Sequence, residues 1–216
     1  MEIIQMVLGR LQTNCYIIGD TKTKEAVIID PGYPGSKLLA IIENKEWDIK
    51  GIWLTHGHFD HIGAIPFLKE SLGVDVWIYT LENEYLKNPE MNLSSGFLSH
   101  PFSFEADHLI EEGDTLQIGS FSFQVIHVPG HTIGSVCYYE PKEKILFSGD
   151  ALFQGAIGRT DLPKGNLSDL MFHIKNKVLT LPDEIIVYPG HGPKTTIGAE
   201  KRNNPYVSDP WYENNF

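Results

Sequence analysis

Cysteine is scarce in this sequence, and its placement excludes a disulfide-stapled protein. Cys15 and Cys137 are the two cysteines among 216 residues, and neither belongs to a C-x-x-C pair. A pair this small cannot form a disulfide framework. Both cysteines stand in apolar stretches, NCYII and SVCYY, so we expect them to be small buried hydrophobic residues in a reducing compartment.

Basic residues and long apolar runs are also lacking. The chain has 17 Lys and Arg against 28 Asp and Glu, a formal charge of −11. This balance argues against a nucleic-acid groove or an anionic membrane surface, both of which need clustered positive charge. No apolar run approaches the ~18 residues of a membrane helix, and the start MEIIQMVLGR has no signal pattern. We therefore expect a cytoplasmic protein without nucleic-acid or membrane partners.

The order of predicted elements indicates one domain, residues 1–216, of the α+β class. Short β-rich runs punctuated by Gly and Pro dominate the first third, and two hairpins follow, turning at Gly119 and at 141–143. Helices are predicted over 36–47 with Ser36 as N-cap, over 61–73 despite Pro66, near 81–87 and over 168–179. The segment 88–107 is the least regular and is a candidate binding loop. Two packed sheets with helices outside would satisfy this pattern.

The stretch THGHFDHIG, residues 55–63, concentrates ligand chemistry at the end of a predicted strand. His56, His58, Asp60 and His61 occupy six consecutive positions. In an extended backbone, residues two apart point to the same side, so His56 and His58 can share one metal ion while Asp60 and His61 are offset toward another. Imidazole nitrogen and carboxylate oxygen are ligands typical of Zn²⁺, Fe and Mn. A solvated polar loop is the alternative, and it does not explain this density.

Three later stretches repeat the arrangement of a strand that runs into a ligand-type residue. QVIHVPGHT delivers His131, KILFSGDALF delivers Asp150, and EIIVYPGHGP delivers His191. The glycine before each candidate lets the backbone and a metal ion approach closely. Seven candidates result, about the number that two metal ions sharing one carboxylate require.

These four motifs, in this order, resemble the metallo-β-lactamase superfold, and the resemblance covers essentially the whole chain. Within it, the sequence is most similar to the short glyoxalase II-like hydrolases. The resemblance implies a four-layer αββα sandwich. It also implies that His56, His58 and His131 hold a first divalent ion, that Asp60, His61 and His191 hold a second, and that Asp150 bridges them. Zinc is the expected metal, with iron or manganese as alternatives.

The implied reaction is hydrolysis of a small thioester, such as an S-2-hydroxyacylglutathione or its analogue on another thiol, by a metal-bridging hydroxide. Asp60 would orient the hydroxide. Gly158-Arg159 stands where full-length glyoxalase II has a Gly-Lys that contacts glutathione, so Arg159 is a candidate donor to the substrate. The alternative is a surface arginine that supports its loop with Asp161. The helical C-terminal domain of the long enzymes is not present here, which leaves the thiol carrier open.

Other members of the superfold remain as alternatives. Asp150 argues against class B1 and B2 β-lactamases, which have a cysteine there, but lactonases and class B3 enzymes are not excluded by the ligands. Persulfide dioxygenases share the GRTD stretch and use one iron, held by residues that match His56, His131 and Asp150. Their last motif tends to read P-A-H-D, whereas this sequence has Pro189-Gly190-His191-Gly192. A non-catalytic binding protein would typically have lost ligands.

Some features leave the prediction open. His127 lies four residues before His131, but Pro129-Gly130 rules out a shared helical face, so it is expected to be a strand residue, with a supporting contact to a ligand as the alternative. His100, His108 and His173 have no ligand partners at suggestive spacing and are expected to be surface or structural residues. The oligomeric state is unknown, because the aromatic residues of the carboxyl-terminal tail could cover the core or a second subunit. These residues are Tyr206, Trp211, Tyr212 and Phe216.

Overall fold

Two six-stranded sheets form the centre of the molecule in the computed structural model, which describes residues 1–208. The first sheet contains, in spatial order, β1 (Glu2–Leu8), β2 (Thr13–Gly19), β3 (Glu25–Ile29), β4 (Asp48–Trp53), β5 (Val76–Tyr79) and β6 (His108–Ile110). The second contains β14 (Thr195–Thr196), β13 (Ile186–Pro189), β10 (Ile145–Gly149), β9 (Val136–Glu140), β8 (Phe121–His127) and β7 (Thr115–Ile118). A small hairpin, β11 (Leu152–Phe153) with β12 (Ala156–Ile157), follows β10.

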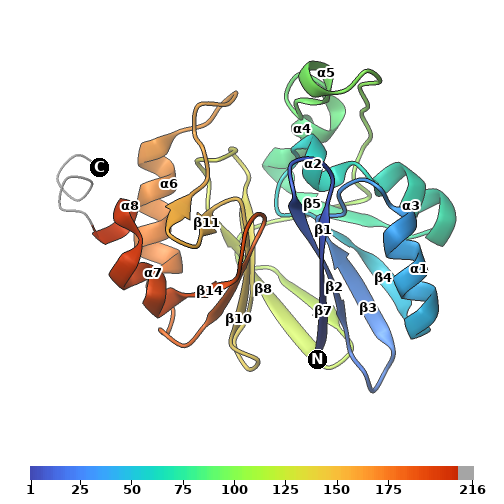
Figure 1. Ribbon diagram of the computed structural model, residues 1–216, viewed down its shortest axis with the longest axis horizontal. Coiled ribbons are helices and arrows are strands. Elements are labelled where there is room, and N and C mark those ends of the chain that lie inside the picture. Colours follow the sequence, from blue (N-terminus) through green and yellow to red (C-terminus); the bar gives the residue numbers. More distant parts are fainter. Residues whose placement is uncertain (209–216) are drawn as a thin grey trace.

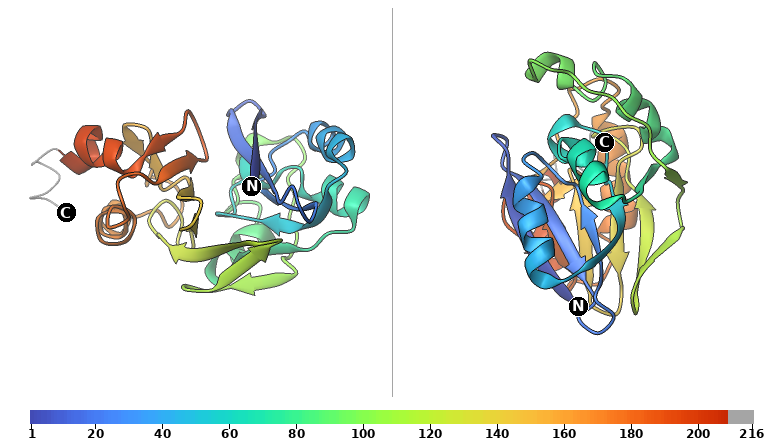
Figure 2. Two further views of the ribbon diagram at one scale, coloured as in Figure 1. Left: turned by 90° about the horizontal axis from the view of Figure 1, so that it is seen from below. Right: turned by 90° about the vertical axis from the view of Figure 1, so that its right-hand side faces the viewer.

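Helices lie on the outer faces of both sheets, as Figures 1 and 2 show. Beside the first sheet are α1 (Ser36–Lys45), α2 (Phe59–Ile62) and α3 (Ile65–Leu72), followed by η1 (Thr80–Glu82), α4 (Asn83–Lys87) and α5 (Ser94–Phe97). Beside the second are α6 (Leu167–His173), the π-helical turn η2 (Ile174–Val178), α7 (Ile197–Asn203) and α8 (Pro205–Ser208). The predicted αββα sandwich is confirmed.

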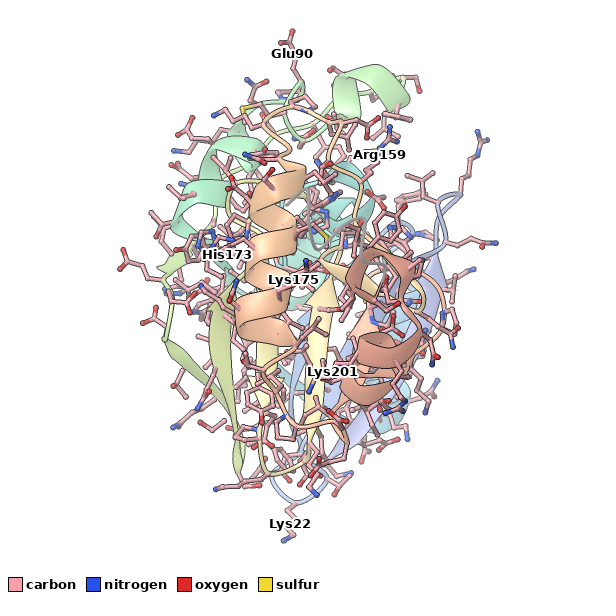
Figure 3. The ribbon with its side chains drawn as sticks, turned by 90° about the vertical axis from the view of Figure 1, so that its left-hand side faces the viewer. Lys22, Glu90, Arg159, His173, Lys175 and Lys201 are labelled. Atoms are coloured by element: carbon pink, nitrogen blue, oxygen red, sulfur yellow. The ribbon has the colours of Figure 1, made fainter. Side chains whose placement is uncertain are left out.

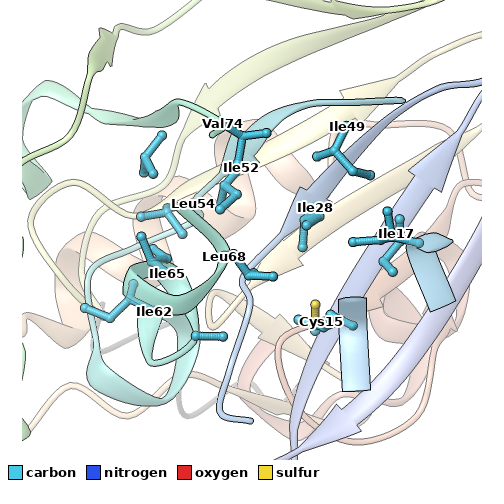
Figure 4. Packing of buried hydrophobic residues seen from close by; sticks show 14 of the residues in the cluster. Cys15, Ile17, Ile28, Ile49, Ile52, Leu54, Ile62, Ile65, Leu68 and Val74 are labelled. Atoms are coloured by element: carbon cyan, nitrogen blue, oxygen red, sulfur yellow. The ribbon is translucent and has the colours of Figure 1, made fainter. Parts of the chain in front are cut away.

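Strand β2 shows why the sequence folds into four layers. Its side chains alternate between the two faces of the sheet. Cys15 and Ile17 pack into the cluster beneath α1 and α3, which Figure 4 shows from close by, while Tyr16 and Ile18 pack between the sheets. All four are buried. A strand covered on both faces has no solvent side, which explains why residues 15–18 of this strand form a continuous apolar run.

The second sheet is built in the same way. Val125 and Tyr138 point to the inter-sheet cluster, whereas Cys137 and Val187 pack with residues of α6, η2 and α7. Tyr206 joins this outer cluster. The other aromatic residues of the tail, Trp211, Tyr212 and Phe216, lie outside the described residues. Both cysteines are free and buried, as expected.

Three of the helix predictions need correction. Helix α1 begins at Ser36 itself, its N-cap residue is Gly35, and no side chain caps it. The predicted helix over 61–73 is divided into α2 and α3 at Gly63-Ala64. Pro66 therefore falls in the first turn of α3, where its missing N–H leaves no helical hydrogen bond unmade. The helix predicted over 168–179 begins as α6 and widens into η2.

The candidate site residues come together because β4, β8, β10 and β13 all run toward one end of the sandwich. The loops that follow them carry the motif after β4, His131, Asp150 and His191 respectively. Figure 1 shows α2, which follows β4, at the end of the sandwich opposite the amino terminus. Among residues 1–208, no helix is long and apolar enough to cross a membrane.

Candidate metal centre

The loop after β4 changes conformation within the motif. His58 has an extended backbone at the N-cap position of α2, whereas Asp60 and His61 lie inside that helix. The extended part brings the His56 and His58 rings to 4.8 Å between centroids, with the rings perpendicular. Sequence spacing predicted that these two side chains would share a side, and they do. The helical turn then directs Asp60 and His61 to a neighbouring position.

The first group of donor atoms belongs to His56, His58 and His131. One ligand atom from each lies within 4.8 Å of the others, and all three side chains are buried. Nδ1 of His58 lies 2.9 Å from Nε2 of His131. These two histidines come from different sheets, so the group spans the sandwich.

The second group contains Asp60, His61 and His191, whose ligand atoms also lie within 4.8 Å of one another. Nε2 of His61 lies 3.3 Å from Nε2 of His191 and 3.5 Å from Oδ2 of Asp60. Nε2 of His191 lies 3.3 Å from the same carboxylate oxygen. This group is less enclosed than the first, since the His191 side chain is 27% exposed and that of Asp60 is 14% exposed.

Asp150 lies between the two groups. Its Oδ1 is 3.4 Å from Nε2 of His61, and its Oδ2 is 3.6 Å from Nε2 of His131 and 3.5 Å from Nε2 of His191. One carboxylate therefore contacts histidines of both groups. All seven residues singled out in the sequence converge at this place.

In three of the candidate histidines, the ring nitrogen that faces away from the donor group is held by the protein. Nδ1 of His61 lies 3.0 Å from Oδ2 of Asp30, Nδ1 of His131 lies 2.8 Å from the carbonyl of Arg159, and Nδ1 of His191 lies 3.1 Å from the carbonyl of Leu11. Each contact turns Nε2 toward the centre. Such contacts fix the ring and its tautomer in metal sites.

Asp30 and Thr13 are supporting residues that the sequence analysis missed. Asp30 is buried and accepts hydrogen bonds from the backbone N–H and the hydroxyl of Thr55, at 2.8 and 2.6 Å. Its carboxylate also lies close enough to His56 and His61 to form a third donor group with them. The bonds from Thr55 engage both of its oxygens, which favours a supporting role. Thr13 donates from Oγ1 to Oδ2 of Asp60 at 2.7 Å.

A signal for Asp30 was present in the sequence, and a signal for Thr13 was not. Asp30 ends the apolar run EAVIID, in the same way that Asp150 ends KILFSGD. Thr13 is one of many threonines, and only the pairing of its strand end with His191 brings it to the site.

Gly190 is required by the packing of the site. A Cβ there would lie 2.1 Å from Oδ1 of Asp150 and 2.8 Å from Cε1 of His61. Both distances are shorter than any real Cβ contact. Gly190 therefore lets side chains of two other motifs pack against its backbone, and the predicted close approach of a metal ion stays a prediction.

The carboxylates of this centre are not balanced by positive charge on the histidines of the first donor group. Burial lowers the pKa of His56, His58 and His131 and so favours the neutral imidazoles that bind metals. Burial also opposes a charged His61, but the carboxylates of Asp60, Asp150 and Asp30 outweigh it and raise its pKa to about 10. Buried carboxylates require a positive partner, either this proton or a cation in its place.

Unpartnered buried atoms support a cation in that role. Within residues 1–208, Nε2 of His56, Nε2 of His58 and Oδ1 of Asp150 are buried without a hydrogen-bond partner. Buried polar atoms in native proteins are nearly always satisfied. A donor set of five imidazoles and two carboxylates fits divalent zinc, iron or manganese.

Arg159 lies at the edge of the centre with its guanidinium facing Asp161. Its Nε and NH2 groups each donate to one Asp161 oxygen at 2.7 Å, and both side chains are largely exposed. Figure 3 shows Arg159 at the same end of the molecule as Glu90 and far from Lys22. The ion pair is the arrangement expected of a loop support, while the exposed position leaves the guanidinium accessible to a substrate.

The other histidines lie outside the donor groups. His127 ends β8 and stacks on Tyr79, with 4.3 Å between ring centroids. His100 and His108 are exposed, and His173 is half-buried. None of the four belongs to a donor group among residues 1–208.

The irregular segment 88–107 packs against the motif after β4. The N–H of Phe59 donates to the carbonyl of Asn92 at 2.8 Å, and the Phe59 ring stacks on Phe97 with 5.1 Å between centroids. Phe97 is 62% exposed. The segment therefore adds exposed aromatic surface beside the helix that carries Asp60 and His61, and Figure 2 shows it at the loop end of the sandwich.

Comparison with known proteins assigns the family. The model of the metallo-β-lactamase superfamily matches residues 8–191, and the chain belongs to this superfamily. The chain is 42% identical to the Haemophilus influenzae protein named hydroxyacylglutathione hydrolase GloC, over 96% of this chain and 99% of that one.

Solved structures agree with this assignment. The chain superimposes on BLEG-1 B3 metallo-β-lactamase with a TM-score of 0.91 and 44% identity, over 96% of this chain and all of that one. It superimposes on TTHA1623 in a di-iron-bound form with a TM-score of 0.85 and 38% identity, over 94% and 99% of the two chains. The family and the clustered histidines and aspartates together support a metal-dependent hydrolase.

Proposed function

We propose that this protein is a binuclear metal-dependent hydrolase that cleaves a small thioester of the S-2-hydroxyacylglutathione type. The observation that carries the proposal is the pair of three-residue donor groups with Asp150 in contact with both. The name of the Haemophilus influenzae relative, 42% identical over nearly its whole length, supports the substrate class.

In the proposed centre, His56, His58 and His131 hold one ion, Asp60, His61 and His191 hold the other, and Asp150 serves both. When bound, two divalent ions would supply an activated water molecule and a Lewis acid for the thioester carbonyl. Zinc is the proposed metal, and the di-iron form of TTHA1623 keeps iron as an alternative.

Asp60 has a further proposed role, which is to orient the attacking water through a hydrogen bond to its carboxylate. Its carboxylate is held by the Thr13 hydroxyl and remains partly exposed, whereas the first group of histidines is closed to solvent. The carboxylate stays ionised at neutral pH. Burial opposes its ionisation, but His61, His191 and the Thr13 hydroxyl outweigh burial and lower the pKa of Asp60.

No cysteine of the chain is suited to act as the nucleophile. Burial raises the pKa of the Cys137 thiol to about 12 and that of Cys15 well above its usual value. A thiolate is the attacking form of cysteine, so both thiols are unreactive at neutral pH. The thioester itself needs little acid assistance, because its leaving group is a thiolate. These points favour water as the nucleophile.

Two free thiols also agree with the proposed reducing, cytoplasmic setting.

The test is hydrolysis of S-lactoylglutathione by purified protein loaded with zinc or, anaerobically, with iron. We expect kcat/KM of at least about 10⁴ M⁻¹ s⁻¹ with one of the metals. The Asp150→Ala variant, loaded in the same way, should show background rates. Absence of cleavage with both metals, in a protein that binds two ions, would contradict the thioester assignment.

β-Lactam hydrolysis is the second candidate. It is favoured by the 44% identity and the TM-score of 0.91 to BLEG-1 B3 metallo-β-lactamase. The same zinc-loaded sample should be assayed with a chromogenic cephalosporin and with a lactone. The iron-loaded sample should be assayed for oxygen uptake with glutathione persulfide. We expect each of these rates to lie well below that of the thioester. A higher rate with one of these substrates would move the assignment to that reaction.

A further inference from the structure

Glu82 is a buried carboxylate that lies outside the donor groups and yet connects two of the loops that form them. It ends η1, directly after β5, and is fully buried. Its Oε2 accepts a hydrogen bond from the backbone N–H of Gly57 at 2.8 Å, and its Oε1 accepts one from the N–H of Gly134 at 2.8 Å. The hydroxyl of Thr132 is a third partner.

The positions of these partners relate Glu82 most directly to the first donor group. Gly57 lies between His56 and His58, and Thr132 and Gly134 follow His131. The first two histidines extend from the first sheet and the third from the second sheet. The first donor group is divided between two loops, and the Glu82 carboxylate joins these two loops. The second group depends instead on Asp30, Thr13 and the carbonyl of Leu11.

The fit around Glu82 is close on both sides. A Cβ at Gly57 would lie 2.6 Å from Cβ of Tyr85 and 3.3 Å from Oε2 of Glu82. A Cβ at Gly134 would lie 2.7 Å from Cγ of Glu82. Both N–H groups can reach the carboxylate because a glycine occupies each position.

A carboxylate matches these donors better than its uncharged analogue. It offers two acceptor oxygens to two backbone N–H groups, whereas glutamine has one oxygen and would turn its NH₂ toward the other N–H. Burial opposes ionisation and raises the pKa of Glu82 to about 7, while the three donors act in the other direction.

We propose that Glu82 is a positioning residue for the first metal ion, which holds His56 and His58 in register with His131 across the two sheets. This inference rests on the proposed function, since it requires that the two donor groups bind metal. Replacing a group that orients a metal ligand typically lowers metal affinity 10- to 100-fold. Glu82 would act in this way through the loop backbone instead of through a ligand ring.

The experiment is a cobalt(II) titration of the metal-free protein and of its Glu82→Gln variant, followed by absorption spectra and metal analysis. The two donor groups are measured separately in two variant proteins. His191→Ala disrupts the second group and leaves the first intact, and His131→Ala disrupts the first group and leaves the second intact. We expect Glu82→Gln to weaken cobalt binding about 10- to 100-fold in the His191→Ala background and less than twofold in the His131→Ala background.

Glu140→Gln is the matched control. Glu140 is also buried, and its Oε2 accepts the N–H of Glu143 in the turn between β9 and β10, away from the histidines. This variant should leave both cobalt affinities unchanged. If Glu82→Gln does not fold, Glu82→Asp serves in its place, since it keeps the charge but is one methylene too short to reach both loops. The same selective loss is expected.

Unchanged affinity in both backgrounds, or an equal loss in both, would overturn the role of Glu82. A parent protein that binds fewer than two ions would contradict the proposed function itself.

Discussion

Asp150 is the residue on which the proposed centre should depend most, because its carboxylate contacts histidines of both donor groups. We expect Asp150→Ala to lower the metal content from two ions per chain to below one and to reduce kcat/KM roughly a hundredfold or more. Metal analysis of the purified variant, together with its circular dichroism spectrum, is the measurement. Asp169→Ala, which removes an exposed carboxylate, is the control. Full occupancy with normal turnover in Asp150→Ala would show that Asp150 is no ligand.

Replacing Arg159 tests whether its side chain contacts the substrate or only supports its loop. We expect Arg159→Ala to raise KM about tenfold, equivalent to about 1.4 kcal/mol, with little change in kcat, since the contact would be remote from the reacting carbonyl. Steady-state kinetics with S-lactoylglutathione measure this.

Asp161→Ala is the informative partner of that variant, because it removes the ion pair and leaves the guanidinium. It should keep KM within about threefold of the parent, since an exposed pair contributes little. An unchanged KM in Arg159→Ala would assign the arginine to loop support alone.

At the scale of elements, Asp20 joins the two sheets at the end of the sandwich away from the metal centre. It follows β2 and accepts hydrogen bonds from the N–H and hydroxyl of Ser120, in the turn between β7 and β8, at 2.9 and 2.8 Å. The N–H of Lys22 is a further donor at 2.8 Å. Figure 3 shows Lys22 at the opposite end of the molecule from Arg159 and Glu90.

These bonds make the contribution of Asp20 depend on pH. The backbone N–H of Ser120, followed by that of Lys22 and the Ser120 hydroxyl, lowers the pKa of Asp20 from 3.8 to about 2. A group whose pKa is lower in the folded state stabilises that state above the unfolded pKa, and the benefit is lost as pH falls through the folded pKa. Asp20→Asn should therefore lower the free energy of unfolding equally from pH 7 to pH 5.

The difference between the parent and Asp20→Asn should then shrink as pH falls from about 4 toward 2. Urea unfolding of both proteins in the presence of a chelator measures it, because the protonation of the metal ligands then affects both proteins alike. A difference that stays constant down to pH 2 would contradict this account of Asp20.

At the scale of the whole molecule, the proposed metal centre draws its candidate ligands from loops of both sheets, so metal removal should destabilise the fold. An ion present at a thousand times its Kd stabilises the native state by about 4 kcal/mol. For a chain of this size that corresponds to a Tm shift of roughly 10 °C per site. We expect a chelator to lower Tm by at least this amount and added zinc to restore it, as measured by calorimetry. Equal Tm values with and without zinc would show that the ions do not couple the sheets.

The sequence by itself determined the fold class and the seven candidate ligands, because both are written in short local patterns. An apolar strand followed by Gly and then His or Asp is visible in fewer than ten residues, and four such patterns in order are specific. It did not determine where the helices divide. The sequence around Gly63-Ala64 continues the helical spacing on both sides. In the structure this junction is tightly packed, since a Cβ at Gly63 would lie 3.1 Å from the Phe59 carbonyl oxygen and 3.4 Å from Cβ of Tyr33.

The tertiary structure alone decided which side chains support the ligands. Asp30 and Thr55 are 25 residues apart, Thr13 and Asp60 are 47 apart, and Glu82 and Gly134 are 52 apart. A hydrogen bond between such residues leaves no periodicity in the sequence, and a buried glutamate has the same one-letter code as a solvated one. The candidate ligands were recognisable because their residue types are chemically rare. Their supports are common residues, which acquire a role only when two sheets bring distant loops within 3 Å of each other.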